Sequence, residues 1–188
     1  MERILVRACL LGVPVRYDGT AKRRDDEILA RWRSEDRLVS CCPEVSGGLP
    51  VPRSPAELAP AAGCPVPVAP PASGVADESV STDVAAVLDG GAKVLTAGGL
   101  DVTAAFVRGA ELALEVAQRY AVRIAVLKEG SPSCGSSRIY DGTFTGRATS
   151  GFGVTTALLT RHGIRVFSED RLSAAASYLA ELESTNSQ

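Results

Sequence analysis

Three cysteines and one glutamate are the side chains of this sequence best suited to metal chemistry. Cys9, Cys42 and Cys134 each follow a short apolar segment, and Glu44 is two residues from Cys42. Thiolates bind soft metals, so they could hold zinc or an iron–sulfur cluster. With zinc, a water molecule would complete the site and a glutamate could act as base. With a four-iron cluster, three protein thiolates would leave one iron free to bind a substrate atom. The residues predict a metal-dependent active site and leave both metals open.

Short apolar β-strands must bring these cysteines together. We expect strands at residues 3–8, 38–41 and 124–127, and each ends close to one of the three cysteines. In an open parallel sheet, ligands bind outside the carboxyl ends of the strands. The loop at 131–137 is rich in serine and glycine, which lets backbone amides approach a bound anion or cluster closely. The sequence therefore predicts that the three thiols meet at one edge of the sheet.

The rest of the chain alternates helices with strands. We expect further strands at 93–96 and 164–167, and helices at 25–36, 103–120, 154–161 and 171–182. Continuously apolar strands that alternate with helices are typical of a mostly parallel sheet covered on both faces. The predicted fold class is α/β, a doubly wound sandwich. No G-x-G-x-x-G motif follows the first strand, so the pattern gives no support for dinucleotide binding.

The length of 188 residues suits one domain with its own core, and we expect residues 1–188 to form a single domain. Residues 59–74 are rich in proline, which predicts a surface loop within that domain. Cys64 lies in this loop. Cys41 neighbours Cys42 and should point to the opposite side of its strand. We therefore expect neither Cys41 nor Cys64 to bind the metal.

Charge and composition indicate where in the cell the protein is located and which classes of partner it can bind. The formal net charge is −2 and no basic cluster is present, so a nucleic acid is not expected as a partner. Arg7 interrupts the apolar stretch that a secretory signal would need, and no apolar run reaches transmembrane length. We expect a cytoplasmic protein without membrane contact, whose five cysteines stay reduced. The sequence gives no indication of the oligomeric state.

The chain contains a single histidine, His162, next to Gly163 at the end of a predicted helix. A histidine in this position most often interacts with the last helix carbonyls and the helix dipole. We therefore do not expect a Cys–His dyad.

The cysteines belong to a series of motifs that resembles the thiouracil desulfidase family, formerly described as a domain of unknown function. The motifs follow the family's order over nearly the whole chain, and the proline-rich stretch around Cys64 is the main departure. They are Cys9-Leu10-Leu11-Gly12, Arg16-Tyr17-Asp18-Gly19, Cys42-Pro43-Glu44, Gly47-Gly48-Leu49, Pro52-Arg53, Asp101-Val102-Thr103, Lys128, Ser131-Pro132-Ser133-Cys134-Gly135, Ile139-Tyr140-Asp141-Gly142-Thr143-Phe144 and the segment 151–159.

The resemblance implies a Rossmann-like fold and an oxygen-sensitive 4Fe-4S cluster. Cys9, Cys42 and Cys134 would hold this cluster, with one iron not ligated by the protein. The implied reaction removes sulfur from a small thiolated pyrimidine, such as 2-thiouracil or 4-thiouracil, and gives the oxo base and hydrosulfide. The matched positions make Glu44 the catalytic acid–base and Ser131 a proton-handling partner.

Two other functions fit the same residues. A desulfidase could act on thionucleosides or on thiouridine in transfer RNA, although the lack of a basic patch counts against the RNA polymer. A non-catalytic iron–sulfur sensor or zinc-stabilised module would use the cysteines without turnover. Bound iron without activity on thiouracil would favour the iron–sulfur sensor, and one bound zinc per chain would favour the zinc-stabilised module.

Overall fold

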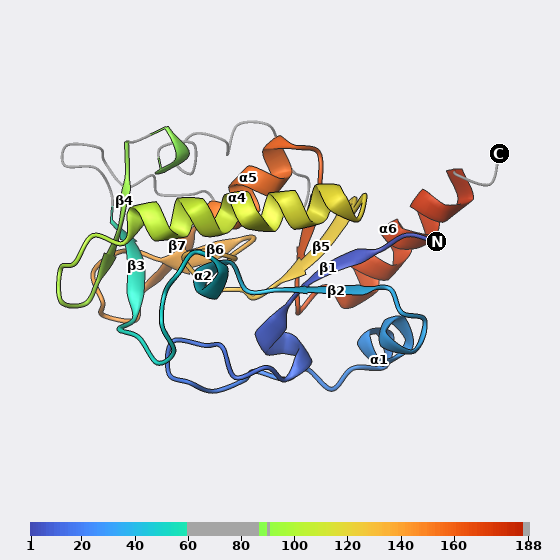
Figure 1. Ribbon diagram of the computed structural model, residues 1–188, viewed down its shortest axis with the longest axis horizontal. Coiled ribbons are helices and arrows are strands. Elements are labelled where there is room, and N and C mark those ends of the chain that lie inside the picture. Colours follow the sequence, from blue (N-terminus) through green and yellow to red (C-terminus); the bar gives the residue numbers. More distant parts are fainter. Residues whose placement is uncertain (60–86, 90, 186–188) are drawn as a thin grey trace.

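Four parallel strands form the central sheet of the computed structural model, which describes residues 1–59, 87–89 and 91–185. They are β1 (Ile4–Arg7), β2 (Leu38–Cys41), β5 (Ile124–Leu127) and β8 (Arg165–Ser168), in the order β2-β1-β5-β8. Each neighbouring pair is parallel. The strands therefore share one carboxyl edge, which points toward the short helix α2 in Figure 1. The four predicted strands at these positions are confirmed to within one residue at each end.

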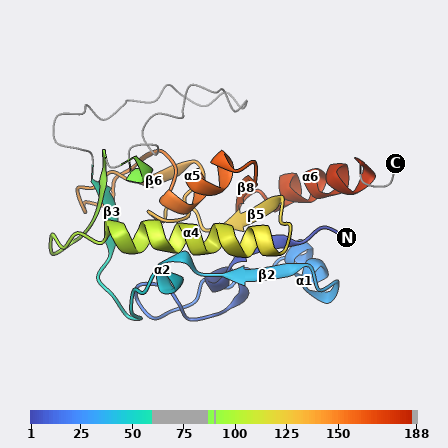
Figure 2. The same cartoon turned by 45° about the horizontal axis from the view of Figure 1, so that its top comes forward.

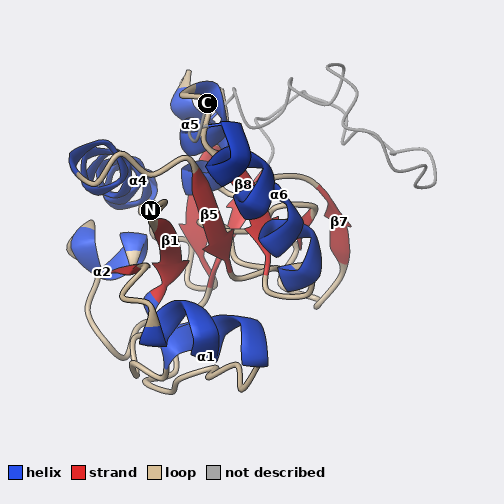
Figure 3. Ribbon diagram, turned by 90° about the vertical axis from the view of Figure 1, so that its right-hand side faces the viewer, coloured by secondary structure: helices blue, strands red, loops and turns tan. Residues whose placement is uncertain are grey.

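Helices cover both faces of this sheet (Figure 3). On one face, α1 (Glu27–Ser34) and α6 (Leu172–Thr185) form a core cluster with Ile4 and Val6. On the other face, α4 (Thr103–Arg119) and α5 (Val154–Arg161) enclose Leu5. Successive strand residues point to opposite faces, which is why β1 contributes to both clusters. The predicted doubly wound α/β sandwich is confirmed.

Two small antiparallel sheets lie beside the central one. One pairs β3 (Ala56–Ala59) with β4 (Lys93–Thr96), and the other pairs β6 (Arg138–Tyr140) with β7 (Ala148–Ser150). The predicted strand at 93–96 is therefore present, but in a separate sheet. The buried carboxylate of Glu57 accepts hydrogen bonds from the backbone amides of Gly142 and Phe144, which ties the first sheet to the turn that follows β6.

The predicted proline-rich loop at 59–74, with Cys64, lies outside the described residues apart from Ala59, which ends β3. In the part of the chain that the structure describes, no helix has the length and apolar character needed to cross a membrane.

Two short helices follow β1 and β2 at the carboxyl edge, and Cys9 and Cys42 lie at these two helices. The 3-10 helix η1 (Ala8–Leu11) continues from β1, and α2 (Pro43–Ser46) follows β2. Helix α2 packs against α4 (Figures 1 and 2) at two glycines. A Cβ added at Gly47 would lie 2.1 Å from the Ala105 carbonyl oxygen, and one added at Gly109 would lie 2.1 Å from the Pro43 carbonyl oxygen. Only glycine permits this approach, which fixes α2 relative to the sheet.

Candidate active site

The structure places the three predicted cysteines at the carboxyl edge of adjacent strands. Cys9 lies in η1 after β1, Cys42 is the N-cap of α2 after β2, and Cys134 lies in the loop that follows β5. The exposed fractions of these residues are 0%, 7% and 0%. All of the described cysteines are free thiols. Because β2, β1 and β5 are neighbours in the sheet, residues far apart in the sequence converge here, as predicted.

Arg7, the last residue of β1, lies among these thiols and is only 3% exposed. Its Nη1 donates a hydrogen bond of 2.6 Å to the Cys134 Sγ, and its charge also acts on the Cys9 thiol, whose pKa it lowers against the larger effect of burial. Its Nη2 donates to the Glu44 Oε1 over 2.6 Å. Burial lowers the pKa of the Arg7 guanidinium, but the charges of Cys134, Glu44 and the other two thiols outweigh it, so the pKa lies above its ordinary value. Arg7 is therefore a permanent positive charge at the centre of the site.

Glu44, in α2, is a buried carboxylate held by two arginines. Its Oε1 accepts from Arg7, and its Oε2 accepts from the Arg53 guanidinium, whose Nε lies 3.1 Å away. Burial raises the pKa of Glu44, but Arg7 and Arg53 outweigh that effect and bring the pKa below its usual value. Glu44 is therefore ionised at neutral pH, the state that a proton acceptor needs.

Ser131 connects Glu44 to the Cys134 loop. Its hydroxyl donates to the Glu44 Oε1 over 3.2 Å. The Ser131 hydroxyl oxygen in turn accepts from the backbone amides of Ser133, at 3.2 Å, and Cys134, at 3.3 Å. The structure thus brings together all five residues predicted for the site, although the roles predicted for them stay predictions.

A second buried carboxylate, Glu129, fixes the far side of the same loop. It accepts hydrogen bonds from the backbone amides and hydroxyls of Ser136 and Ser137 and from the amide of Arg138. The sequence analysis missed this residue. A glutamate directly after an apolar strand and before a serine-rich loop was the available signal, because a buried carboxylate needs several donors.

Replacing Glu129 by glutamine should lower the free energy of unfolding by about 1–3 kcal/mol at neutral pH, because the glutamine nitrogen cannot accept from the two serine hydroxyls. Burial raises the pKa of Glu129, but the hydrogen bonds from Arg138, Ser136 and Ser137 outweigh it, so the pKa is lowered in the fold. The carboxylate therefore stabilises the fold above its unfolded pKa, and this contribution is lost as the pH falls through the lower folded value. Urea unfolding at several pH values measures both effects.

Glu111→Gln, a change at an exposed glutamate of α4, serves as the control and should leave the unfolding free energy unchanged. Equal stability of the wild type and the Glu129→Gln variant at neutral pH would refute this role for Glu129.

The two arginines give the site a positive charge that suits an anionic group. Arg7 and Arg53 share the single carboxylate of Glu44, and the buried Nε of Arg7 has no hydrogen-bond partner among the described residues. Burial raises the pKa of the Cys134 thiol to about 12, despite the opposing effect of Arg7, and it also raises that of Cys9. With the thiols protonated, the single carboxylate of Glu44 balances only one of the two arginine charges, whereas thiolates bound to metal would balance both.

The donor set fits an iron–sulfur cluster. Within the described ranges, no three His, Cys, Asp or Glu side chains are close enough to chelate one metal ion. A four-iron cluster needs soft ligands that carry negative charge. Thiolates are the usual ligands of such clusters. The three thiols provide the ligand type that such a cluster needs, and the buried guanidinium of Arg7 provides positive charge next to it.

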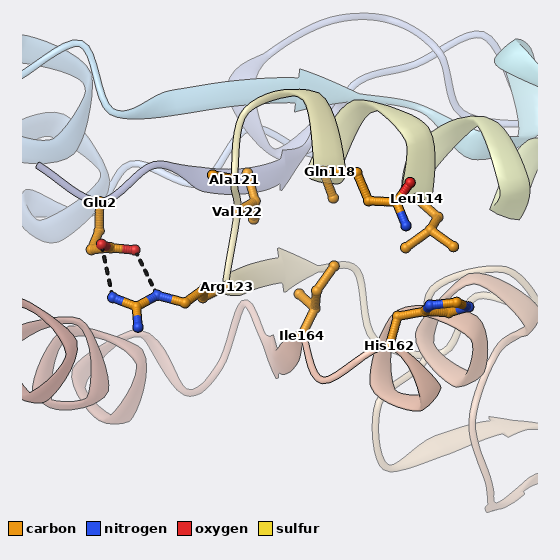
Figure 4. Close-up of a pocket in the computed structure, with 9 residues that line it drawn as sticks. Glu2, Leu114, Gln118, Ala121, Val122, Arg123, His162 and Ile164 are labelled. Carbon is orange, nitrogen blue, oxygen red and sulfur yellow. Dashed lines mark hydrogen bonds and ion pairs between the residues drawn. The ribbon is translucent and has the colours of Figure 1, made fainter.

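His162 lies away from this site. It is the C-cap of α5, as expected, and lines a cavity of about 440 Å³ together with Glu2, Arg123 and Ile164 (Figure 4). Glu2 and Arg123 precede β1 and β5, so this cavity is at the amino edge of the sheet, opposite the cysteines. This cavity is therefore away from the reactive groups, and His162 does not lie beside any of the cysteines that the structure describes.

Three comparisons with known proteins found matches over most of the chain. The chain matches the family described as 2-thiouracil desulfurase over residues 4–171. It is 39% identical to the uncharacterized protein YbbK of Bacillus subtilis (strain 168) over 169 residues, which cover 90% of this chain and 97% of that protein. Among solved structures it is similar to a [4Fe-4S]-dependent thiouracil desulfidase, TudS, with 47% identity and a TM-score of 0.76. That match covers 96% of this chain and 99% of the other.

Proposed function

The chain belongs to the 2-thiouracil desulfurase family, and on this basis we propose that it is a 4Fe-4S-dependent desulfidase of thiolated pyrimidines. It removes sulfur from a small base of the 2-thiouracil or 4-thiouracil class and gives the oxo base and hydrosulfide. The observation that carries the proposal is the convergence of three buried thiols on Arg7, next to the ionised carboxylate of Glu44. We also propose that the chain is a single domain, built around its one four-stranded sheet, and that it is cytoplasmic, where its described cysteines would stay reduced.

Cys9, Cys42 and Cys134 are the proposed ligands of the cluster, which leaves one iron without a protein ligand. When bound, the cluster supplies a Lewis acid that attracts the soft thiocarbonyl sulfur and polarises its carbon. The overall reaction adds one water and releases one hydrogen sulfide, so no electrons are consumed.

Glu44 is the proposed acid–base. Because Arg7 and Arg53 keep it ionised, it can accept a proton from the water that attacks the substrate carbon. Both arginines also fix the direction of the carboxylate, since each donates to a different oxygen. We propose that the Ser131 hydroxyl, which donates to the Glu44 Oε1 over 3.2 Å, passes the proton on.

Replacing Ser131 by alanine should lower kcat by about 10-fold, the scale of one lost hydrogen bond to a charged group. The reason is that Glu44 keeps both arginines and loses only its hydroxyl donor. Ser131→Thr keeps the hydroxyl and should recover most of the rate. Steady-state rates of thiouracil consumption measure the effect, with iron content as the check on cluster loading. Wild-type kcat in a fully loaded Ser131→Ala variant would exclude the proton-handling role.

The substrate assignment is tested by supplying the anaerobically reconstituted enzyme with 2-thiouracil, 4-thiouracil, the matching thionucleosides and thiolated transfer RNA. Loss of the thiocarbonyl absorbance and release of hydrosulfide are followed for each. We expect the highest kcat/KM for a free base. A higher value for a nucleoside or for the RNA would overturn the substrate class, and a loaded enzyme that converts none of them would favour a sensor.

A further inference from the structure

Arg7 connects a cluster ligand to the acid–base residue. It ends the strand that lies between β2 and β5, the two strands that lead to Cys42 and Cys134. Its two terminal nitrogens donate to different partners, Nη1 to the Cys134 Sγ and Nη2 to the Glu44 Oε1, each over 2.6 Å. A guanidinium is planar and rigid, so one contact constrains the other.

The contacts that the protein gives Arg7 do not balance its charge. Its only carboxylate partner in the described ranges, Glu44, is shared with Arg53. Its Nε is buried without a hydrogen-bond partner in the same part of the chain. A buried guanidinium whose charge is only partly compensated lowers the stability of the fold. The thiolate of Cys134, which Arg7 already contacts, is the anion that can complete this charge balance.

We propose that Arg7 is a positioning residue, which donates a hydrogen bond to the Cys134 thiolate of the bound cluster and holds the Glu44 carboxylate beside it. This inference rests on the function proposed above and adds a residue that the motifs of the sequence did not single out.

Two separate effects follow. Hydrogen bonds to ligand sulfurs and nearby positive charge stabilise the reduced, more negative state of a cluster, so Arg7 raises the reduction potential. By fixing Glu44, Arg7 also supports turnover. A residue that only stabilised the fold would change the unfolding free energy and leave the potential unchanged.

Arg7→Met and Arg7→Lys variants, reconstituted anaerobically, separate these effects. For Arg7→Met we expect a more negative potential in a redox titration, and a fall in kcat/KM of about 10- to 100-fold, the usual range for residues that orient metal ligands. Arg7→Lys keeps the charge but cannot span both partners. Its potential should therefore lie between those of the wild type and Arg7→Met, while its activity remains low.

Arg37→Met is the matched control. Arg37 is partly buried and pairs with two carboxylates, Glu35 and Glu183, but none of the three cysteines is its partner. Its loss should lower stability and leave the potential unchanged.

Arg7→Met alone leaves Glu44 with one arginine fewer. If it fails to take up iron for this reason, the Arg7→Met/Glu44→Gln double variant, which removes both charges of the pair, is used instead. Its reduction potential and that of Arg7→Lys then test the inference. A loaded Arg7 variant with wild-type potential and wild-type kcat/KM would overturn this inference alone. A wild-type protein that binds no cluster would overturn the proposed function as well.

Discussion

Replacing Cys134 by alanine should reduce the bound iron from about four atoms per chain to nearly none. The side chain is fully buried, and its thiol is the one that Arg7 contacts most directly. Two remaining thiolates hold a four-iron cluster too weakly to retain it through purification. Because the change deletes one small buried atom, the unfolding free energy should fall by only about 1 kcal/mol, and the apo-protein should stay folded.

Iron and acid-labile sulfide analysis after anaerobic reconstitution measures this effect. Cys41→Ala is the matched control, because Cys41 is also buried and shares a core cluster with Cys134, but it ends β2 and is not one of the proposed ligands. We expect it to retain full iron, and Cys64→Ala should do the same. Wild-type iron content in the Cys134→Ala protein would remove Cys134 from the ligand set.

Replacing Glu44 by glutamine should leave the cluster in place and lower kcat by about 10²- to 10⁴-fold, the range for loss of a general acid–base. Glutamine has the size of glutamate, so the packing of α2 against α4 is preserved, although its one oxygen can accept from only one of the two arginines and the unfolding free energy should fall. It cannot accept the proton of the attacking water. The rate of loss of the thiocarbonyl absorbance, per bound cluster, measures the effect.

Glu2→Gln is the control for Glu44→Gln. Glu2 also forms an ion pair with an arginine, Arg123, but at the opposite edge of the sheet. The same change there should leave kcat unchanged. Undiminished activity of the Glu44→Gln enzyme would refute the acid–base assignment.

The central sheet could be predicted from the sequence because its strands are short apolar runs that alternate with helical periodicity. The convergence of Cys9, Cys42 and Cys134 followed from the geometry of parallel strands, whose carboxyl ends share one edge. The family and the reaction expected from the motifs are confirmed by the comparisons.

Other features depend on contacts that a linear pattern does not contain. Arg7 interrupts an apolar stretch, which was interpreted only as evidence against a secretory signal, whereas in the fold it is the charge that joins Cys134 to Glu44. The strands β6 and β7 were missed because each has only three residues, too few to show an alternating pattern. The strand at 93–96 was predicted, but its antiparallel partner β3 follows a turn-rich segment that hid it.

The measurement that tests the central claim most directly combines two quantities on one anaerobically reconstituted sample. These are the iron and acid-labile sulfide per chain, and the hydrosulfide released per thiouracil consumed. We predict about four irons and four sulfides per chain, with one hydrosulfide formed for each thiouracil converted to its oxo base. A folded protein that binds one zinc, or that converts thiouracil without iron, would contradict the account.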